Sequence, residues 1–435
     1  TTACSLADRQ NWAATQLTES YLFPDLLATN ANPGSFTTVK DYVDALTAPA
    51  RALGRDRFYT KVTSIAEDKE FLDTGSAAGF GMRVAADDAA RRVFILEAFE
   101  GTPALAAGID RGTEILAIGT GTADLKNVGT IIDAEGSAGI FAALGPNTAG
   151  TARLLRVRDP NGTTRDVTIA KADYPLPPVS SRYGALILDD GGKKVGYLNL
   201  RGFIDPAEQP LRNAFAQFKA QGITEVVVDL RYNGGGTSAA ADLLTNLLLG
   251  RSPAEVMNYR VHRPSKSNLN FTRFFAPQPQ SIASMKVAFI GTSSTASASE
   301  AVMNSVIPYL GTKTALIGGN TFGKPVGTGT IDRPQCDDRL TLLVFATQNA
   351  NKQGDYFDGL ASRFQSTCSV TDDISRALGD PQEAMIRTAL DFLSGKSCTP
   401  ISAGISAQSV SEAGALELLT PKQPDAMQRE MPGTF

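Results

Sequence analysis

Histidine is almost absent from this chain. The 435 residues include one histidine, His262, in the stretch Tyr259-Arg-Val-His-Arg-Pro264. A Ser-His-Asp hydrolase would have to use that single residue, and no serine-centred motif accompanies it. A lone histidine in a loop is more often a solvated side chain than a catalytic group. The G-x-S-x-G nucleophile elbow is also missing, which excludes the usual α/β-hydrolase arrangement, and little material remains for a zinc site.

Long apolar runs and a strong excess of one charge are lacking too. No stretch approaches the roughly 18 to 20 apolar residues needed to cross a bilayer. Forty-one Lys and Arg residues against forty-five Asp and Glu residues give a net charge of −4, so nucleic acid is not an expected partner. The first residues, Thr1-Thr-Ala-Cys-Ser-Leu6, show no signal-peptide pattern. We therefore expect that, if the protein is exported, its signal has already been removed or is not included in this sequence.

Cysteines are few, widely spaced and free of C-x-x-C pairs. The four are Cys4, Cys336, Cys368 and Cys398. An even set of this kind predicts two structural disulfides in an oxidising compartment, the alternative being four buried thiols in a cytosolic protein. We expect Cys336 to pair with Cys368 and Cys4 with Cys398, although spacing alone does not decide the pairing.

The pattern along the chain predicts a mixed α/β multidomain protein, because the length exceeds what one core usually supports. Residues 1–74 are expected to form a helical subdomain, with helices over 8–22 and 38–53, serving either as an accessory or as a substrate gate. Residues 75–174 hold short β-like runs broken by glycine. Residues 178–395 alternate strands and helices. Residues 396–435 form a C-terminal extension, rich in Ser, Ala, Gly and Pro after Cys398, that we expect to pack weakly.

The third segment carries near-continuous Val, Ile and Leu strands between helices, which is typical of an α/β core with a largely buried sheet. The expected strands are 195–200, 225–230, 286–291, 314–317 and 340–345. The expected helices are 206–221, 237–249, 297–310 and 381–393.

The first chemical motif is Gly291-Thr-Ser-Ser-Thr-Ala-Ser-Ala-Ser-Glu300, where an apolar strand leads into small residues that open a helix. A helix N-terminus presents unpaired N–H groups and a positive dipole end, which suit a developing oxyanion. Ser297 is the candidate nucleophile, and the Ala298 N–H would point the same way. The competing interpretation is a simple helix cap, with Glu300 completing a capping box.

Two further motifs favour a catalytic role for this segment over a simple helix cap. Asp229-Leu-Arg-Tyr-Asn-Gly-Gly-Gly236 ends a buried strand in a glycine-rich turn, whose uncovered N–H groups offer a second oxyanion donor. Gly318-Gly-Asn-Thr-Phe-Gly-Lys-Pro-Val-Gly327 delivers Lys324 into a loop of small residues. Burial lowers the pKa of a lysine and makes it a usable general base near neutral pH. A surface lysine is the alternative for Lys324.

Together these three motifs resemble the catalytic domain of the carboxyl-terminal processing (tail-specific) proteases, which are S41-type Ser-Lys peptidases. They stand in the family's order, each after an apolar strand. The resemblance implies Ser297 as nucleophile and Lys324 as base, with the Gly236 and Ala298 N–H groups as oxyanion hole. It also implies a crotonase-like ββα core. Several family members carry a glutamine four residues after the lysine; here Thr328 stands there, so Thr328 or Glu300 could take its role, or a simple dyad could operate.

The second segment looks like a PDZ domain. The resemblance rests on Gly79-Phe-Gly-Met82 followed by residues 101–118, Gly-Thr-Pro-Ala-Leu-Ala-Ala-Gly-Ile-Asp-Arg-Gly-Thr-Glu-Ile-Leu-Ala-Ile. Such a domain binds an extended peptide as an added strand. The N–H groups of Phe80, Gly81 and Met82 would hold the terminal carboxylate.

The resemblance therefore implies a serine endopeptidase that recognises protein or peptide substrates through their C-termini. The implied mechanism needs no metal or cofactor. The implied setting is the bacterial periplasm, possibly with a lipid tether on a residue upstream of this chain. The alternatives are a catalytically silent PDZ-containing peptide-binding scaffold and a crotonase-like acyl-thioester enzyme, for which the sequence offers no basic nucleotide pocket.

Overall fold

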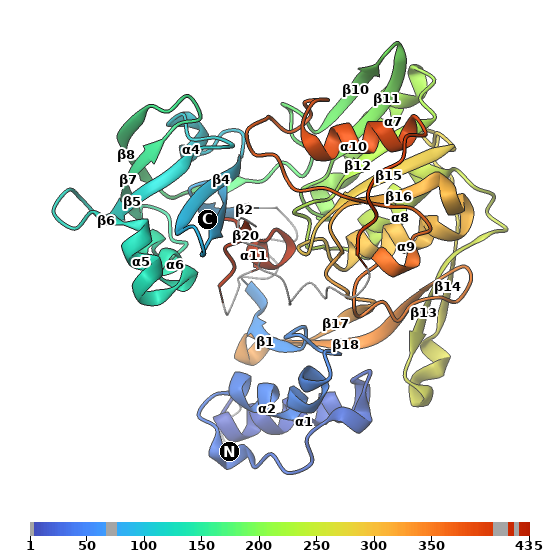
Figure 1. Cartoon of the computed structure of the whole chain (residues 1–435). Coiled ribbons are helices and arrows are strands. Elements are labelled where there is room, and N and C mark those ends of the chain that lie inside the picture. Colours follow the sequence, from blue (N-terminus) through green and yellow to red (C-terminus); the bar gives the residue numbers. More distant parts are fainter. Residues whose placement is uncertain (1–3, 67–75, 403–415, 422–425) are drawn as a thin grey trace. The chain divides into compact units, whose positions relative to one another are not determined.

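The computed structural model describes residues 4–66, 76–402, 416–421 and 426–435 (Figure 1). The chain divides into two compact units. Unit 1 combines residues 1–70, 251–276 and 323–357, and unit 2 combines residues 71–250, 277–322 and 358–435. No helix in the described ranges is long and apolar enough to span a membrane.

Unit 2 is built around a six-stranded sheet in the order β10-β11-β12-β15-β16-β19. β10 and β11 are antiparallel, and the remaining neighbours are parallel. The bounds are β10 Ala185–Asp190, β11 Lys193–Asn199, β12 Glu225–Asp229, β15 Lys286–Gly291, β16 Thr314–Gly318 and β19 Thr367–Ser369. The predicted mixed α/β class is confirmed, and the continuous apolar runs are explained because both faces of the sheet are covered.

Helices cover the two faces of this sheet. α10 (Ala384–Leu393) lies on one face, where its apolar residues join a buried cluster with Tyr197 and Val227 (Figure 1). α7 (Glu208–Ala220) packs on the other face, since an added side-chain carbon at Gly196 would touch Phe218. α8 (Ser238–Leu249) and α9 (Ala298–Leu310) pack against each other. The segments predicted as helices in this region are therefore helical.

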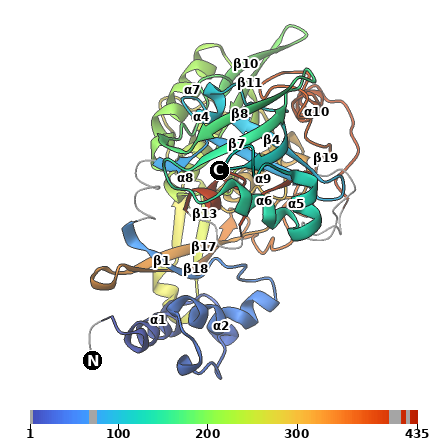
Figure 2. The same ribbon diagram turned by 90° about the vertical axis from the view of Figure 1, so that its left-hand side faces the viewer.

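The same unit contains an antiparallel sheet in the order β20-β3-β4-β5-β7-β8, with β6 paired to β5; β4, β7 and β8 of this sheet are labelled in Figure 2. A separate pair joins β2 (Ser76–Gly79) to β9 (Ala172–Pro175). α4 (Pro103–Ala106), α5 (Val128–Glu135) and α6 (Ser137–Leu144) accompany the sheet. Its strands are β3 Met82–Asp87, β4 Arg92–Ala98, β5 Glu114–Gly119, β6 Lys126–Asn127, β7 Ala152–Arg158, β8 Thr164–Ala170 and β20 Glu417–Leu418.

Unit 1 joins the N-terminal helices to a second antiparallel sheet. α1 (Leu6–Ser20) and α2 (Val39–Ala52) form where helices were expected, and Thr38 caps α2 by accepting from the Asp41 N–H at 3.0 Å. The central strand is β18, which pairs with β1 and β13 along its length and with β17 as a hairpin. The strand bounds are β1 Lys61–Ser64, β13 Val256–His262, β14 Phe271–Phe274, β17 Val326–Arg333 and β18 Asp338–Asn349.

One predicted strand belongs to a different sheet. Residues 340–345 were expected in the α/β core, but they lie within β18 of unit 1. Only the short 3-10 turn Pro334–Cys336 separates β17 from β18, so the chain turns back on itself in a hairpin rather than crossing over to the parallel sheet. An apolar run alone does not say which sheet a strand joins.

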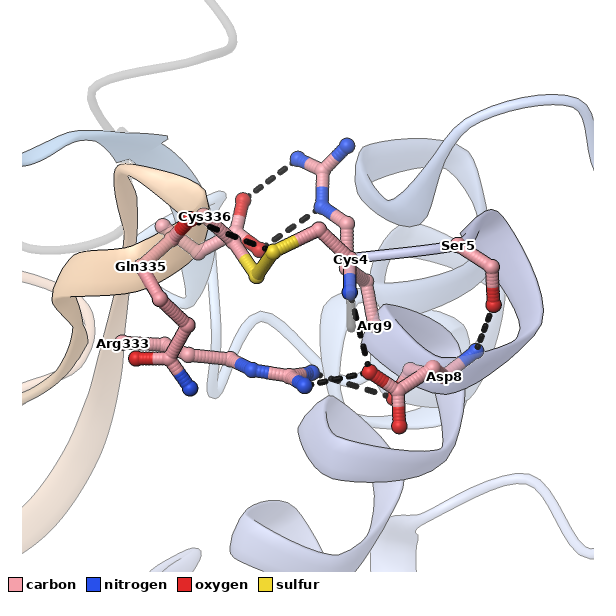
Figure 3. The surroundings of a disulfide bond; sticks show 8 residues. Cys4, Ser5, Asp8, Arg9, Arg333, Gln335 and Cys336 are labelled. Carbon is pink, nitrogen blue, oxygen red and sulfur yellow. Dashed lines mark hydrogen bonds and ion pairs between the residues drawn. A yellow bond between two sulfur atoms is a disulfide. The ribbon is translucent and has the colours of Figure 1, made fainter. Parts of the chain in front are cut away.

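Two disulfides form, as the cysteine pattern predicts, but the expected pairing is wrong. The bonds join Cys4 to Cys336 and Cys368 to Cys398. Figure 3 shows the first bond, where the ion pair of Arg333 with Asp8 and the hydrogen bond from Asp8 N–H to Ser5 Oγ fix the start of α1 nearby. Cys336 lies in the short 3-10 turn after β17 in unit 1, whereas Cys368 lies in β19 of unit 2, so the two residues expected to pair belong to different units.

The expectation of weak packing after Cys398 is wrong near the end of the chain, although residues 399–402 are exposed or partly exposed as expected, and 403–415 and 422–425 lie outside the described residues. Leu419, Met427, Met431 and Phe435 are all buried. Met427 and Met431 pack with Phe99 and Ile204, and Phe435 enters the apolar core of the β20–β8 sheet. Composition suggested a loose tail because the segment after Cys398 is rich in Ser, Ala, Gly and Pro and holds few large apolar side chains.

Candidate active site

Ser297 stands where β15 gives way to α9. Its φ of +57° is uncommon for a residue with a side chain, and such backbone strain often marks functional positions. The Ser297 N–H donates to Glu300 Oε2 at 3.0 Å. Glu300 is fully buried, and its other oxygen accepts from Thr321 Oγ1 at 2.6 Å. The carboxylate thus holds the nucleophile candidate's main chain from inside α9.

The glycine-rich turn after β12 packs directly against Ser297. A side-chain carbon at Gly235 would lie 2.8 Å from Ser297 Cβ and 3.1 Å from the Ala298 nitrogen. Gly236 has a φ of +130°, and an added carbon there would lie 2.1 Å from the Phe203 carbonyl oxygen. Only glycine fits both positions, so the turn that the sequence singled out is shaped to approach the start of α9.

Hydrogen bonds join this turn to the strand-to-helix segment. Thr295 Oγ1 donates to Leu230 O at 2.8 Å, and Ser299 Oγ donates to Asn233 O at 3.0 Å. Within the described parts of the chain, the Gly236 and Ala298 N–H groups donate to no acceptor. The predicted oxyanion donors therefore stand on two neighbouring, rigidly connected turns.

A buried ionic cluster underlies the glycine-rich turn. Arg231 is fully buried and pairs with Asp229 at 2.8 Å, Asp372 at 2.7 Å and Glu383 at 3.0 Å. Burial alone would lower the pKa of Arg231, but these carboxylates outweigh it and raise its pKa well above the ordinary value. Burial likewise opposes ionisation of Asp372, yet Arg111 and Arg231 hold its pKa below the usual range. The arginine and its carboxylate partners therefore remain ionised, and their ion pairs hold the glycine-rich turn in place.

Lys324 belongs to unit 1 and is partly buried there. Its Nζ lies 4.5 Å from the centroid of the Tyr59 ring. Arg57 donates to the carbonyl oxygen of Gly323 at 2.6 Å. Residues of the N-terminal segment therefore hold the lysine and its loop. Thr328 is exposed in β17, opposite Leu343.

The loop predicted to bind a carboxylate lies at the start of β3. The N–H groups of Gly81 and Met82 donate to the main-chain oxygen of Phe435 at 2.9 and 3.3 Å. The Phe80 carbonyl accepts from the Ala104 N–H at 2.9 Å, which ties the loop to α4.

His262 lies at the end of β13, not in a loop as expected. It pairs with Phe345 of β18, whose ring centroid is 5.8 Å from the imidazole. Partial burial lowers the pKa of His262, and Arg260 lowers it further. The histidine is a sheet residue of unit 1.

The structure brings Ser297, Ala298, Glu300 and Gly236 together in unit 2, while Lys324 and Thr328 stand in unit 1. Sequence reasoning missed three features: the support of Lys324 by Arg57 and Tyr59, the cluster around Arg231, and the position of Phe435. The one signal available in the sequence was an arginine at the end of the apolar run 225–230, since a charge that follows a buried strand requires partners.

Comparison with known proteins gives the same family as the three motifs. Residues 194–358 match the model of peptidase family S41. A carboxyl-terminal-processing protease of Picosynechococcus sp. is 28% identical over 253 residues, which is 58% of this chain and 55% of that protein. A Synechocystis sp. protein of the same name is 25% identical over 293 residues, 67% of this chain and 61% of that protein. The chain thus spans little more than half the length of these relatives.

Solved structures of related proteins are similar to this chain as well. A Bacteroides fragilis protein of the S41 protease group superposes with a TM-score of 0.66 and 25% identity, covering 88% of this chain and 97% of that one. The photosystem II D1 C-terminal processing protease superposes with a TM-score of 0.50 and 18% identity, covering 87% and 98%; it shows likeness of fold. The resemblance inferred from the motifs is confirmed: the chain carries an S41 peptidase domain.

Proposed function

We propose that this chain, with its S41 domain at residues 194–358, is a serine endopeptidase that works by a Ser-Lys mechanism. In the proposed reaction the Ser297 oxygen forms a bond to the scissile carbonyl carbon while uncharged Lys324 takes the hydroxyl proton. The Gly236 and Ala298 N–H groups receive the oxyanion. Lys324 then returns the proton to the leaving amine, and water hydrolyses the acyl-enzyme.

One observation carries the proposal: the Gly235–Gly236 turn and the strained Ser297 leave two N–H donors beside a hydroxyl at a helix N-terminus. The covalent chain supports Lys324 as the base. Phe322 N–H donates to Thr295 O at 2.9 Å, only two residues before Ser297. Lys324 follows Phe322 by two residues, which limits the separation of their Cα atoms to about 7 Å.

We further propose that residues 75–174 act as a PDZ-type domain that captures substrate C-termini, and that residues 178–395 have a crotonase-like ββα core. Support for the first comes from the antiparallel sheet with α5 and α6 and from the N–H groups of the 80–82 loop. Support for the second comes from the parallel sheet flanked by α8 and α9. The two disulfides favour an exported protein, for which we propose the periplasm.

The test is cleavage of casein and of C-terminal peptides by the wild type, Ser297→Ala, Lys324→Ala and Lys324→Arg. A coupled pair predicts losses of at least ~10³-fold in both alanine variants. Lys324→Arg keeps the positive charge but cannot act as a base, so it should be equally inactive. Activity in Lys324→Arg would assign the base elsewhere. No cleavage by any form would favour the silent peptide-binding scaffold.

A further inference from the structure

The segment Gly433–Phe435 pairs antiparallel with the first residues of β3. Phe435 N–H donates to Met82 O at 2.9 Å, and Val84 N–H donates to Gly433 O at 2.7 Å. The Phe435 oxygen accepts from the N–H groups of both Gly81 and Met82. The segment is therefore an added strand whose last main-chain oxygen lies in the 80–82 loop, which is how an extended peptide binds a sheet edge.

The loop is shaped for close approach of a main chain. A side-chain carbon at Gly79 would lie 2.8 Å from the Phe435 carbonyl carbon. Gly81 has a φ of +75°, and a carbon there would lie 2.1 Å from Thr102 Cβ. Thr102 in turn donates from Oγ1 to Gly81 O at 3.2 Å. The two glycines leave room for the segment on one side and for the Thr102 brace on the other.

The side chain of Phe435 fills an apolar site beside α6. It is fully buried in a cluster with Phe80, Ile140 and Leu144. Phe141 packs edge-on against it, with ring centroids 5.1 Å apart. Because burial of a phenylalanine side chain away from water is strongly favourable, the site selects for a bulky apolar residue at this position.

A second contact holds the segment upstream. Arg83 of β3 is fully buried, and its Nη1 donates both to Pro432 O and to Tyr232 O, the latter at 3.3 Å. The segment thus shares a guanidinium with the glycine-rich turn that carries Gly236. Met431 packs with Phe99 and Ile204 just before it.

We propose that Gly433–Phe435 is an internal ligand of the peptide groove, and that it must leave before another peptide can bind. The same groove then takes extended peptides that end in a bulky apolar residue, and occupation by the chain's own segment holds back their binding. The proposal rests on the proposed function only in regarding such peptides as substrate tails. The competing role for the segment is purely structural, as a cover for the part of the β3 edge that β20 leaves unpaired.

The experiment measures peptide binding in a Ser297→Ala background, so cleavage plays no part. The probe is a fluorescein-labelled Met-Pro-Gly-Thr-Phe peptide with a free carboxylate, titrated against the full chain and against a deletion of Gly433–Phe435. Because an internal ligand competes at millimolar effective concentration, we expect at least ~10-fold tighter binding to the deletion variant. Equal affinity for the two forms, or no binding to the deletion variant, would overturn the proposal.

A matched pair of substitutions and a thermal readout guard against misfolding. Phe435→Leu keeps an apolar side chain and should keep the groove closed, whereas Phe435→Asp buries a charge and should open it. If the deletion lowers the melting temperature, the free peptide should raise it again, because a ligand of the native state stabilises that state. A melting temperature that does not respond to the peptide would assign the segment to edge protection alone. Failure of the chain with Ser297 intact to cleave casein, with these binding results as expected, would overturn only the peptidase.

Discussion

At the scale of single residues, Gly235, which lies beside the nucleophile candidate Ser297, offers the most direct test. Gly235→Ala places a carbon 2.8 Å from Ser297 Cβ at a φ of +122°. Backbone strain alone should cost about 1–2 kcal/mol of stability, and displacement of Ser297 should remove most peptidase activity. The control is Gly222→Ala, which has a positive φ of +67° but open space around it. Unfolding curves and casein cleavage of the two variants separate strain from displacement; equal activities would contradict the close-packing argument.

Tyr59 acts through Lys324 and is therefore a positioning residue. Its ring lies under Nζ at 4.5 Å, and its N–H donates to Asp56 Oδ1 at 2.9 Å. We expect Tyr59→Ala to lower kcat about 10- to 100-fold, because a small misplacement of a catalytic group is costly, while KM changes little. Tyr59→Phe keeps the ring and should keep kcat. A rise in KM as large as the fall in kcat would point to a general structural role instead. An unchanged pH–rate profile in Tyr59→Ala would point to the same role.

At the scale of elements, the ends of β4 and β11 are joined by a charge pair that predicts acid sensitivity. Glu100 follows β4 and accepts from Arg201, after β11, at 2.8 Å. Burial would raise the pKa of Glu100, but Arg201 and Ser180 outweigh it and lower the pKa to about 2. Since the unfolded value is about 4.3, the contribution is complete above that pH and is lost as the pH falls toward 2.

The predicted size of this contribution is at most about 3 kcal/mol at neutral pH. Unfolding free energies of the wild type and Glu100→Gln should therefore converge as the pH is lowered from 6 to 2. Shifted carboxyl groups that do not share Arg201, such as Glu114, are present in both proteins and cancel in the difference. A difference that does not change with pH would show that Glu100 titrates normally in the folded protein.

Elements formed by local sequence were predictable, and those that depend on distant partners were not. The strand-to-helix transitions at Ser297 and Gly236 follow from apolar runs ending in small residues. The sheet that β18 joins, the partner of Cys4 and the burial of Phe435 depend on pairing across tens to hundreds of residues, for which one sequence carries no signal. The nucleophile side of the site was therefore visible in the sequence, whereas the aromatic support of Lys324 was hidden in the N-terminal segment.

At the scale of the whole molecule, each unit is closed by its own disulfide. Cys4–Cys336 joins residues 332 positions apart in unit 1, and Cys368–Cys398 joins residues 30 positions apart in unit 2. Peptide mapping under non-reducing conditions should recover these two pairs. Recovery of a Cys4–Cys398 or Cys336–Cys368 peptide would contradict the folded arrangement.

The two bonds should differ in what they contribute, because a crosslink that closes a longer loop removes more entropy from the unfolded chain. That argument gives about 3–4 kcal/mol for Cys368–Cys398 and about 6 kcal/mol for Cys4–Cys336. Denaturant unfolding of Cys368→Ser/Cys398→Ser and Cys4→Ser/Cys336→Ser measures both, and the quadruple variant tests whether the effects add, as expected for distant sites. Because Cys4–Cys336 fixes the segment that leads to Tyr59, its loss should also lower kcat, whereas loss of Cys368–Cys398 should leave kcat closer to that of the wild type. The reverse order, in stability or in kcat, would mean that unit 1 does not depend on this crosslink to hold the Lys324 loop.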